Sequence, residues 1–140
     1  MKLRGFAFVI IAVVFSFAPQ FLNTSSAAGG YSAQLITPRA GQVVSPGQRV
    51  RVAWTAVLPP INTKPCEMEV WLSLDGGRTF TMWISPWMNA DARSFDWIVP
   101  NTPTNAAVMD IRFGCEAMYP ESFAPQPAST FVISKAAPAS

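Results

Sequence analysis

The chain has 140 residues, with ten Lys and Arg against eight Asp and Glu, and it contains no histidine. This near balance of charge, with no basic run, argues against a nucleic-acid partner. Without histidine, neither a Ser-His-Asp triad nor a Cys-His pair can form. The length fits a single domain.

Residues 1–28 have the features of a secretory signal peptide. Lys2 and Arg4 precede an apolar run over residues 6–18, and small residues follow; this is the order of regions in such a signal. The apolar run is shorter than the roughly 20 residues of a membrane-spanning helix, although a retained anchor helix is the alternative. We find no lipid-anchor motif. We therefore expect a secreted or periplasmic protein with no membrane span after signal removal.

Residues 29–135 are expected to form one all-β domain. Prolines and glycines separate short runs rich in Val, Ile, Trp, Phe and Thr, a pattern typical of a β-sandwich or barrel. About seven strands are expected, at residues 32–37, 49–57, 67–74, 80–85, 94–99, 106–116 and 130–134, with a short edge segment at 41–45. The proline-containing stretch 119–129 is expected to be a loop, and residues 136–140 a disordered tail.

Cys66 and Cys115 are expected to form a disulfide. Each shares the parity of the apolar residues on its own strand, so both point inward if those faces form the core. Export permits such a bond, and closing a loop of about 50 residues would stabilise the fold by about 4 kcal/mol in the chain-entropy model. Two cysteines so far apart, without histidine, match no zinc spacing, so no metal site is expected.

The stretch SLDGGRTF, residues 73–80, lies between two apolar runs. An aspartate at a turn accepts hydrogen bonds from nearby backbone N–H groups, glycines permit positive φ, and a threonine hydroxyl adds a local bond. The stretch is therefore interpreted as a structural turn carried by Ser73, Asp75, Gly77, Thr79 and Phe80. The alternative is that Asp75 binds a metal or substrate, but one carboxylate is too few for calcium.

These residues fit the pattern Ser-x-Asp-x-Gly-x-Thr-aromatic, and the stretch resembles the Asp-box, a β-hairpin motif of sialidases, other propellers and some isolated sandwich modules. In propellers this hairpin usually lies away from the active site, so the resemblance implies architecture rather than catalysis. A propeller needs at least four four-stranded blades, and the chain is too short to hold them.

A wider resemblance covers most of residues 29–135. The runs PRAGQVVSPGQRVRVAW, EVWLSLDGGRTF and FDWIVPNTPTNAAVMDIRF resemble the immunoglobulin-like and fibronectin-III-like modules of exported bacterial and cell-surface proteins. The resemblance implies a sandwich whose third and sixth strands are antiparallel neighbours, with Cys66 at the start of one beside Cys115 at the end of the other. Such modules are usually non-catalytic spacers, adhesion units or glycan-binding appendages.

An aromatic pair is the candidate binding site. With Asp75–Thr79 as the hairpin loop, Trp71 faces Trp83 across the ladder, and Trp87 follows in the next loop. Two adjacent exposed tryptophans suit the faces of sugar rings or a partner protein, and the nearby Glu69 and Arg112 would hydrogen-bond hydroxyls. The alternative is that the pair only stabilises the hairpin.

We therefore expect a secreted, non-enzymatic binding or adhesion module that recognises a cell-surface glycan or an envelope protein and carries no cofactor. One alternative is a structural accessory subunit of an exported envelope complex, joined through an edge strand. A remote alternative is a small hydrolase that uses two carboxylates, for which Asp96 and Asp110 are candidates by elimination.

Overall fold

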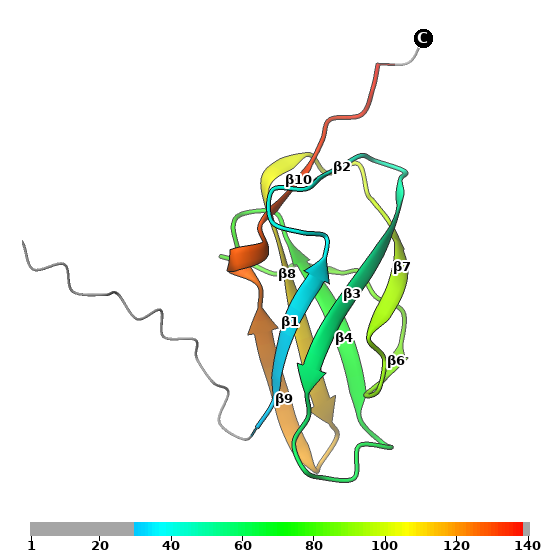
Figure 1. Cartoon of the computed structure of the whole chain (residues 1–140), viewed down its shortest axis with the longest axis vertical. Helices are drawn as coiled ribbons and strands as arrows, with labels where there is room; N and C mark the ends of the chain where they lie inside the picture. The colour runs from blue at the N-terminus through cyan, green and yellow to red at the C-terminus, as the bar shows by residue number, and fades with distance from the viewer. Residues whose placement is uncertain (1–29, 139–140) are drawn as a thin grey trace, which may run out of the picture.

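A computed structural model describes residues 30–138, which contain strands and one short 3-10 turn but no α-helix (Figure 1). The strands are β1 Ser32–Thr37, β2 Val43–Val44, β3 Arg49–Val57, β4 Glu67–Ser73, β5 Met82–Trp83, β6 Met88–Asn89, β7 Ser94–Ile98, β8 Thr104–Cys115, β9 Tyr119–Pro125 and β10 Phe131–Ile133. The turn η1 spans Pro127–Ser129. The expected signal peptide, residues 1–28, and the last two residues of the expected tail lie outside the described residues.

The strands form two open sheets. The smaller has the order β1-β3-β7, and the larger has the order β2-β10-β8-β4-β5, with β6 also paired to β4 and β9 to β8. The pairing of β2 with β10 is parallel, and the other pairs are antiparallel. Two open sheets of three and seven strands are the arrangement of a β-sandwich, so the all-β prediction is confirmed at this level.

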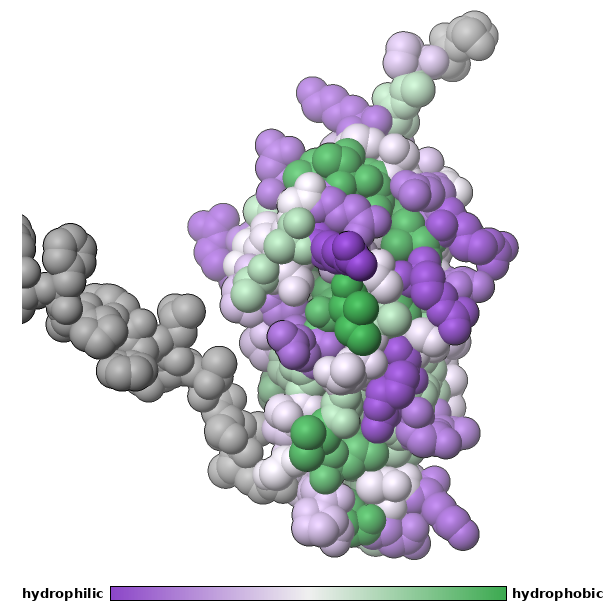
Figure 2. Space-filling model, in the orientation of Figure 1, coloured by the Kyte–Doolittle hydropathy of each residue, from purple (hydrophilic) through white to green (hydrophobic). Residues whose placement is uncertain are grey.

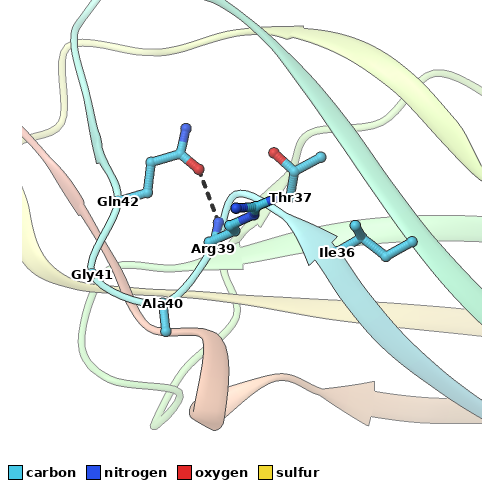
Figure 3. A pocket seen from close by; sticks show the side chains of 6 residues that line it. All are labelled: Ile36, Thr37, Arg39, Ala40, Gly41 and Gln42. Atoms are coloured by element: carbon cyan, nitrogen blue, oxygen red, sulfur yellow. Dashed lines mark hydrogen bonds between the residues drawn. The ribbon is translucent and has the colours of Figure 1, made fainter.

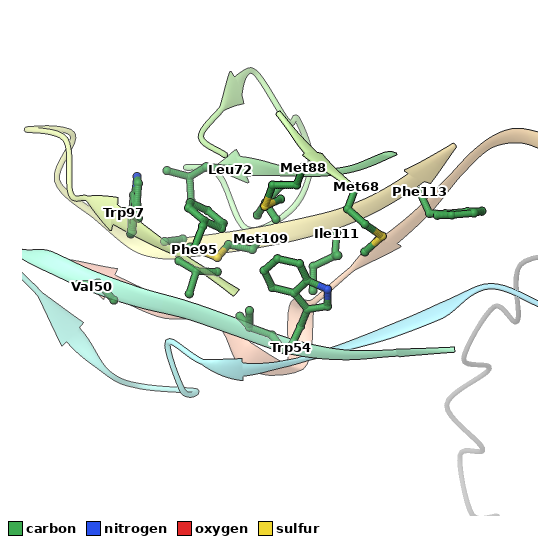
Figure 4. Close-up of a cluster of buried hydrophobic side chains, with 14 of the residues drawn as sticks. Val50, Trp54, Met68, Leu72, Met88, Phe95, Trp97, Met109, Ile111 and Phe113 are labelled. Carbon is green, nitrogen blue, oxygen red and sulfur yellow. The ribbon is translucent and has the colours of Figure 1, made fainter. Parts of the chain in front are cut away.

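The core fills the space between the sheets because side chains alternate along each strand. On β3, Val50, Val52 and Trp54 are buried, while Arg49 and Arg51 point to solvent. Figure 4 shows Trp54 between the two layers, with the buried side chains of the larger sheet above it. This alternation leaves the outer face of each sheet free to carry polar and aromatic side chains.

The disulfide between Cys66 and Cys115 is present and lies within the larger sheet. The register of β4 against β8 pairs Glu67 with Gly114, which places the two cysteines opposite each other at the next position. Both are buried. The predicted pairing is confirmed, and it fixes the start of β4 to the end of β8.

The expected loop at 119–129 is wrong, because residues 119–125 form β9, which pairs with β8. Its prolines, Pro120 and Pro125, argued against a strand. They are tolerated because β9 is an edge strand: within the described residues it pairs with β8 on one side and carries no strand on the other. Only the η1 turn and the residues around it connect β9 to β10.

The expected strand 80–85 is shorter than predicted, since β5 covers only two residues. The chain leaves the sheet after Trp83 because a side chain, instead of the backbone, accepts the next hydrogen bond from β4. Ser85 Oγ accepts the Val70 N–H at 3.0 Å, while Ile84 N–H donates to the Val70 carbonyl at 3.0 Å. The chain then returns to β4 as β6, which the sequence analysis did not anticipate.

Candidate binding face on the larger sheet

The outer face of the larger sheet brings the predicted binding residues together. The register pairs Glu69 with Arg112 on β8, and it pairs Trp71 with Trp83 on β5. Because these four residues share the outward parity of their strands, they lie on one face. Trp87 lies beyond β5, in the connection to β6, and is 72% exposed. The predicted cross-strand tryptophan pair is confirmed.

Arg112 lies at the centre of this face, between two aromatic rings. Its guanidinium carbon is 4.5 Å from the ring centroid of Trp71 and 4.8 Å from that of Phe123. Such cation–π contacts are stronger where the cation is partly desolvated. Its Nε donates to Asp110 Oδ2 at 2.8 Å, and its Nη1 donates to Glu121 Oε1 at 3.4 Å. Arg112 is therefore held on every side by protein groups.

Asp110 is the buried partner that fixes Arg112. It is 2% exposed, and its Oδ1 accepts the Ala124 N–H of β9 at 2.9 Å. Burial raises the pKa of this carboxyl, while the hydrogen bond from Arg112 acts in the opposite direction. Asp110 and the other candidate carboxylate, Asp96, project from opposite sides of the sandwich, because Asp96 lies outward on β7 and pairs with Arg51 at 3.3 Å. The geometry does not bring these two aspartates together.

The two paired tryptophans differ in exposure. Trp71 is only partly exposed, and its indole N–H donates to Glu69 Oε2 at 2.8 Å. Trp83 is 48% exposed, and its indole N–H donates to Ser85 Oγ at 2.9 Å. Phe123, which the sequence analysis did not single out, is 52% exposed. We call the row Trp83, Trp71, Arg112 and Phe123 the aromatic stripe; it crosses four neighbouring strands.

A hollow of about 610 Å³ lies beside this stripe. We call it the glutamate hollow, because the four glutamates of the chain all line it. Its lining includes Glu67, Glu69, Trp71, Arg112, Glu116 and Glu121. Sequence reasoning assigned Glu69 and Arg112 to the binding site but did not assign the other three glutamates to it. The disulfide was the signal that would have found two of them, since Glu67 and Glu116 flank the bonded cysteines.

The position of Glu67 in the hollow raises its affinity for protons. The pKa of Glu67 lies above its ordinary value, first because of partial burial and then because of Glu69, Glu116 and Glu121. Within residues 30–138, ion pairs on this face join Arg112 to Asp110 and to Glu121, and Glu67, Glu69 and Glu116 take part in none. The hollow therefore carries uncompensated negative charge.

The predicted turn at Asp75 holds itself together. Ser73 Oγ donates to Asp75 Oδ1 at 2.7 Å and accepts the Gly77 N–H at 2.9 Å. The Thr79 N–H donates to Asp75 Oδ1 at 2.9 Å, and the Thr79 hydroxyl donates to Oδ2 at 2.7 Å. These bonds, from Ser73 first, hold the pKa of Asp75 well below its usual range. Both carboxylate oxygens are occupied, as a structural turn requires.

The loop of this hairpin also packs against β8. The Gly76 N–H donates to the Ala106 carbonyl at 2.9 Å. Gly77 lies beside Val108, and a Cβ atom added at Gly77 would come within 3.6 Å of the Val108 side chain. Gly76 and Gly77 have φ of 77° and 87°, a region that other residues rarely adopt. The loop thus covers one end of the larger sheet's outer face.

The side of the molecule that carries β1 and β3 offers a poorer site. Figure 2 shows apolar and polar side chains interspersed on this side, without one continuous apolar area. A hollow of about 680 Å³ lies along residues 36–42. Among the residues that line it, the backbone N–H of Arg39 donates a hydrogen bond to Gln42 Oε1 at 2.9 Å (Figure 3). Arg39 is the only charged side chain that lines it.

The described residues contain neither a metal-type cluster of side chains nor a membrane-spanning helix. No three His, Cys, Asp or Glu side chains between residues 30 and 138 are grouped as a metal site needs. The same stretch holds no helix long and apolar enough to cross a membrane. Comparison of the chain with protein-family models, with curated proteins and with solved structures found no match.

Proposed function

We propose that this chain is a secreted or periplasmic, non-enzymatic binding module, and that it binds a cell-surface glycan or envelope protein through the outer face of its larger sheet. The observation that carries the proposal is the aromatic stripe. Trp83 and Phe123 at its two ends are about half exposed, while Arg112 at its centre is fixed by Asp110 and Trp71. Rigid aromatic groups on a preformed surface lose little conformational entropy when they bind.

The strand order supports assigning the sandwich to the immunoglobulin-like or fibronectin-III-like class. The order β10-β8-β4-β5 corresponds to the G-F-C-C′ order of variable-type domains, and β1-β3-β7 corresponds to A-B-E. The sequence runs quoted above for the resemblance provide β3, β4, β7 and β8. The disulfide supports export, because such bonds persist in oxidising compartments.

The binding role is favoured over hydrolysis by the placement of the carboxylates. Asp110 is buried against Arg112, and Asp96 faces the opposite side of the sandwich. A two-carboxylate mechanism needs the groups within about 10 Å on either side of one bond. The four glutamates do gather at one hollow, but they border an open sheet face that does not exclude water.

The test compares two tryptophan variants. The chain, exported from its full-length sequence, is titrated with a panel of polysaccharides and with an extract of the host envelope. We expect saturable binding that Trp83→Ala weakens at least tenfold and that Trp87→Ala leaves nearly unchanged, because Trp87 lies outside the stripe. Circular dichroism confirms folding of both variants. Binding that neither substitution affects would contradict the proposed face.

A second candidate function is that of an accessory subunit held by β-strand addition. It is favoured by the edge of the smaller sheet, where β7 pairs with β3 and has no second neighbour within the described residues. Ile98 on this strand is 52% exposed. An open edge binds an extended partner through main-chain hydrogen bonds. Copurification of one partner that Trp83→Ala retains, without sugar binding, would favour this function over the first.

A further inference from the structure

The chain concentrates all its glutamates around one hollow. Glu67 and Glu69 lie on β4, Glu116 lies in the turn between β8 and β9, and Glu121 lies on β9. The antiparallel register and the Cys66–Cys115 disulfide bring these two regions together. The four aspartates lie outside the lining of this hollow. The negative charge is therefore localised on one part of one face.

This charge is not neutralised from within the described residues. Arg112, the one cation that lines the hollow, is already engaged by the buried Asp110 at 2.8 Å and by Glu121 at 3.4 Å. Its remaining surroundings are the two rings that sandwich it. Partial burial first, and then the charges of Glu69, Glu116 and Glu121, raise the pKa of Glu67. A bound cation would relieve this repulsion.

We infer that the glutamate hollow binds a positively charged, extended polypeptide segment, with a Lys or Arg side chain placed among the glutamates. This inference rests on the proposed binding function and names its ligand class. The hollow, about 610 Å³, falls within the range of ligand sites. Trp71 and Tyr119 in its lining offer apolar surface for the aliphatic stem of such a side chain.

The chemistry favours an organic cation over a metal ion. A calcium ion needs six to eight oxygen ligands at short range, and the carboxylates of the described residues are not grouped closely enough to provide them. A lysine or arginine head, by contrast, interacts with several carboxylates arranged around an open hollow. Negative potential at a cleft also speeds the approach of a cationic partner.

A polypeptide fits the site better than a sugar because of the stripe beside it. The exposed side chains of Trp83 and Phe123 lie on the same sheet face as the hollow, beyond its lining. A segment that places one cation in the hollow can therefore lay neighbouring side chains along the stripe. Neutral sugars gain nothing from the three carboxylates that take part in no ion pair within residues 30–138, and acidic sugars are repelled by them.

The probe is an acetylated and amidated decapeptide of alternating Lys and Ser, titrated into the full-length exported protein. We expect Glu67→Gln and Glu116→Gln to weaken binding by roughly two- to fivefold each, the effect of losing one exposed ion pair. Asp91→Asn removes an exposed carboxylate outside the hollow and is the matched control, expected to leave the affinity unchanged. The same peptide with every lysine acetylated should not bind.

A second readout locates the peptide. In ¹⁵N–¹H spectra, the indole signal of Trp71 should shift on titration, because this indole donates to Glu69 at the hollow, whereas that of the buried Trp54 should not. Equal weakening by Asp91→Asn and Glu67→Gln would overturn the inference, since attraction would then be non-specific. Tighter binding of a glucosamine oligosaccharide than of the peptide would also overturn it, as would salt-sensitive self-association that occupies the hollow.

The outcomes separate this inference from the proposed function. Sugar or envelope-protein binding that depends on Trp83 but not on Glu67 would leave the binding module intact and overturn the cationic ligand. If the protein bound neither the polysaccharides and envelope extract nor the peptide, both the proposed function and the cationic ligand would be overturned. Peptide binding that depends on Glu67 and Glu116, with a folded protein, supports both.

Discussion

Leu35 donates its backbone N–H to the side-chain Oε1 of Gln126 at 2.9 Å, although the two residues are 91 positions apart. The same amide donates from Nε2 to the carbonyls of Ala33 at 3.0 Å and Ala124 at 2.7 Å. Gln126 is 8% exposed. Its side chain thus takes the place of a neighbouring strand at the free edge of β1. It also ties the smaller sheet to the end of β9.

Gln126→Leu should lower the free energy of unfolding by about 1–3 kcal/mol. Leucine keeps similar bulk but leaves the Leu35 N–H and the Ala33 carbonyl without partners, and buried unpaired groups cost about that much. Urea unfolding measures the change. Gln34→Leu is the matched control, because Gln34 is exposed on the outer side of β1. Equal stability of Gln126→Leu and the parent chain would contradict the role of the amide.

Asp75→Asn should destabilise the hairpin most at neutral pH. The native pKa of Asp75 is depressed, so its charged form contributes stability above the ordinary carboxyl pKa of about 3.9. That contribution is lost as the pH falls below this value, because protons then bind the unfolded chain preferentially. The stability difference between the parent and Asp75→Asn should therefore shrink between pH 7 and pH 2. A difference that does not change with pH would show that the charge is unimportant.

Replacing the disulfide should cost several kcal/mol without changing the fold. The bond joins residues separated by 49 positions, and a loop of this length gives about 4 kcal/mol in the chain-entropy model. Cys66→Ala/Cys115→Ala should show this loss in urea unfolding, and addition of a reductant should not affect the variant. Because the register of β4 and β8 also holds the pair together, circular dichroism should remain that of a β-protein. A loss below about 1 kcal/mol would contradict the cross-link's role.

Arg112→Met should be strongly destabilising, and Asp110→Asn should rescue it. Removing one partner of a buried ion pair costs about 3–5 kcal/mol because the other charge is left unpaired, and Asp110 is 2% exposed. Arg112 is slightly more exposed, so the lower end of the range applies. The double variant should recover most of the loss, as an interaction between contacting residues requires. Additive losses would show that the two residues act independently.

The Arg112–Asp110 ion pair also predicts how the stability of Arg112→Met changes with pH. The native pKa of Asp110 is already raised by burial, and removal of Arg112 raises it further. Protonation of Asp110 then stabilises the folded state as the pH falls toward the ordinary carboxyl value. Arg112→Met should therefore lie closest to the parent chain in stability near pH 5 and furthest from it at pH 7. Unfolding curves at the two pH values test this.

The alternation of residues along each strand was sufficient to predict which side chains share a face and how the strands of a local hairpin pair. It placed Trp71 opposite Trp83 and set both cysteines inward, because a strand alternates its side chains with a period of two. The Asp75 turn followed from the same kind of local chemistry. Elements whose geometry depends on residues close in sequence were therefore predictable.

The glutamate hollow was not predictable in this way, because it depends on the long-range pairing of β9. Pro120 and Pro125 made residues 119–125 read as a loop, and without β9 neither Phe123 nor Glu121 has a place on the face. The exposure of Trp71 depends on the same strand, since Phe123 holds Arg112 against it. Parity gives the direction of a side chain, but neighbours on other strands decide what covers it.

The affinity of the hollow for the Lys-Ser peptide should fall as the solution is acidified. The native pKa of Glu67 lies above its ordinary value, and a bound cation favours the charged carboxylate, so binding and protonation compete. The titratable and charged groups that line the hollow with Glu67 are Glu69, Arg112, Glu116, Tyr119 and Glu121.

The decline should therefore begin above the pH at which an exposed glutamate titrates, and Glu67→Gln should move its onset to lower pH. Asp91→Asn should reproduce the parent profile, because Asp91 lies outside the lining. Peptide titrations at half-unit steps between pH 4 and pH 7.5 provide the measurement. A parent profile that matches that of Glu67→Gln would remove Glu67 from the binding site, since its proton would then not compete with the ligand.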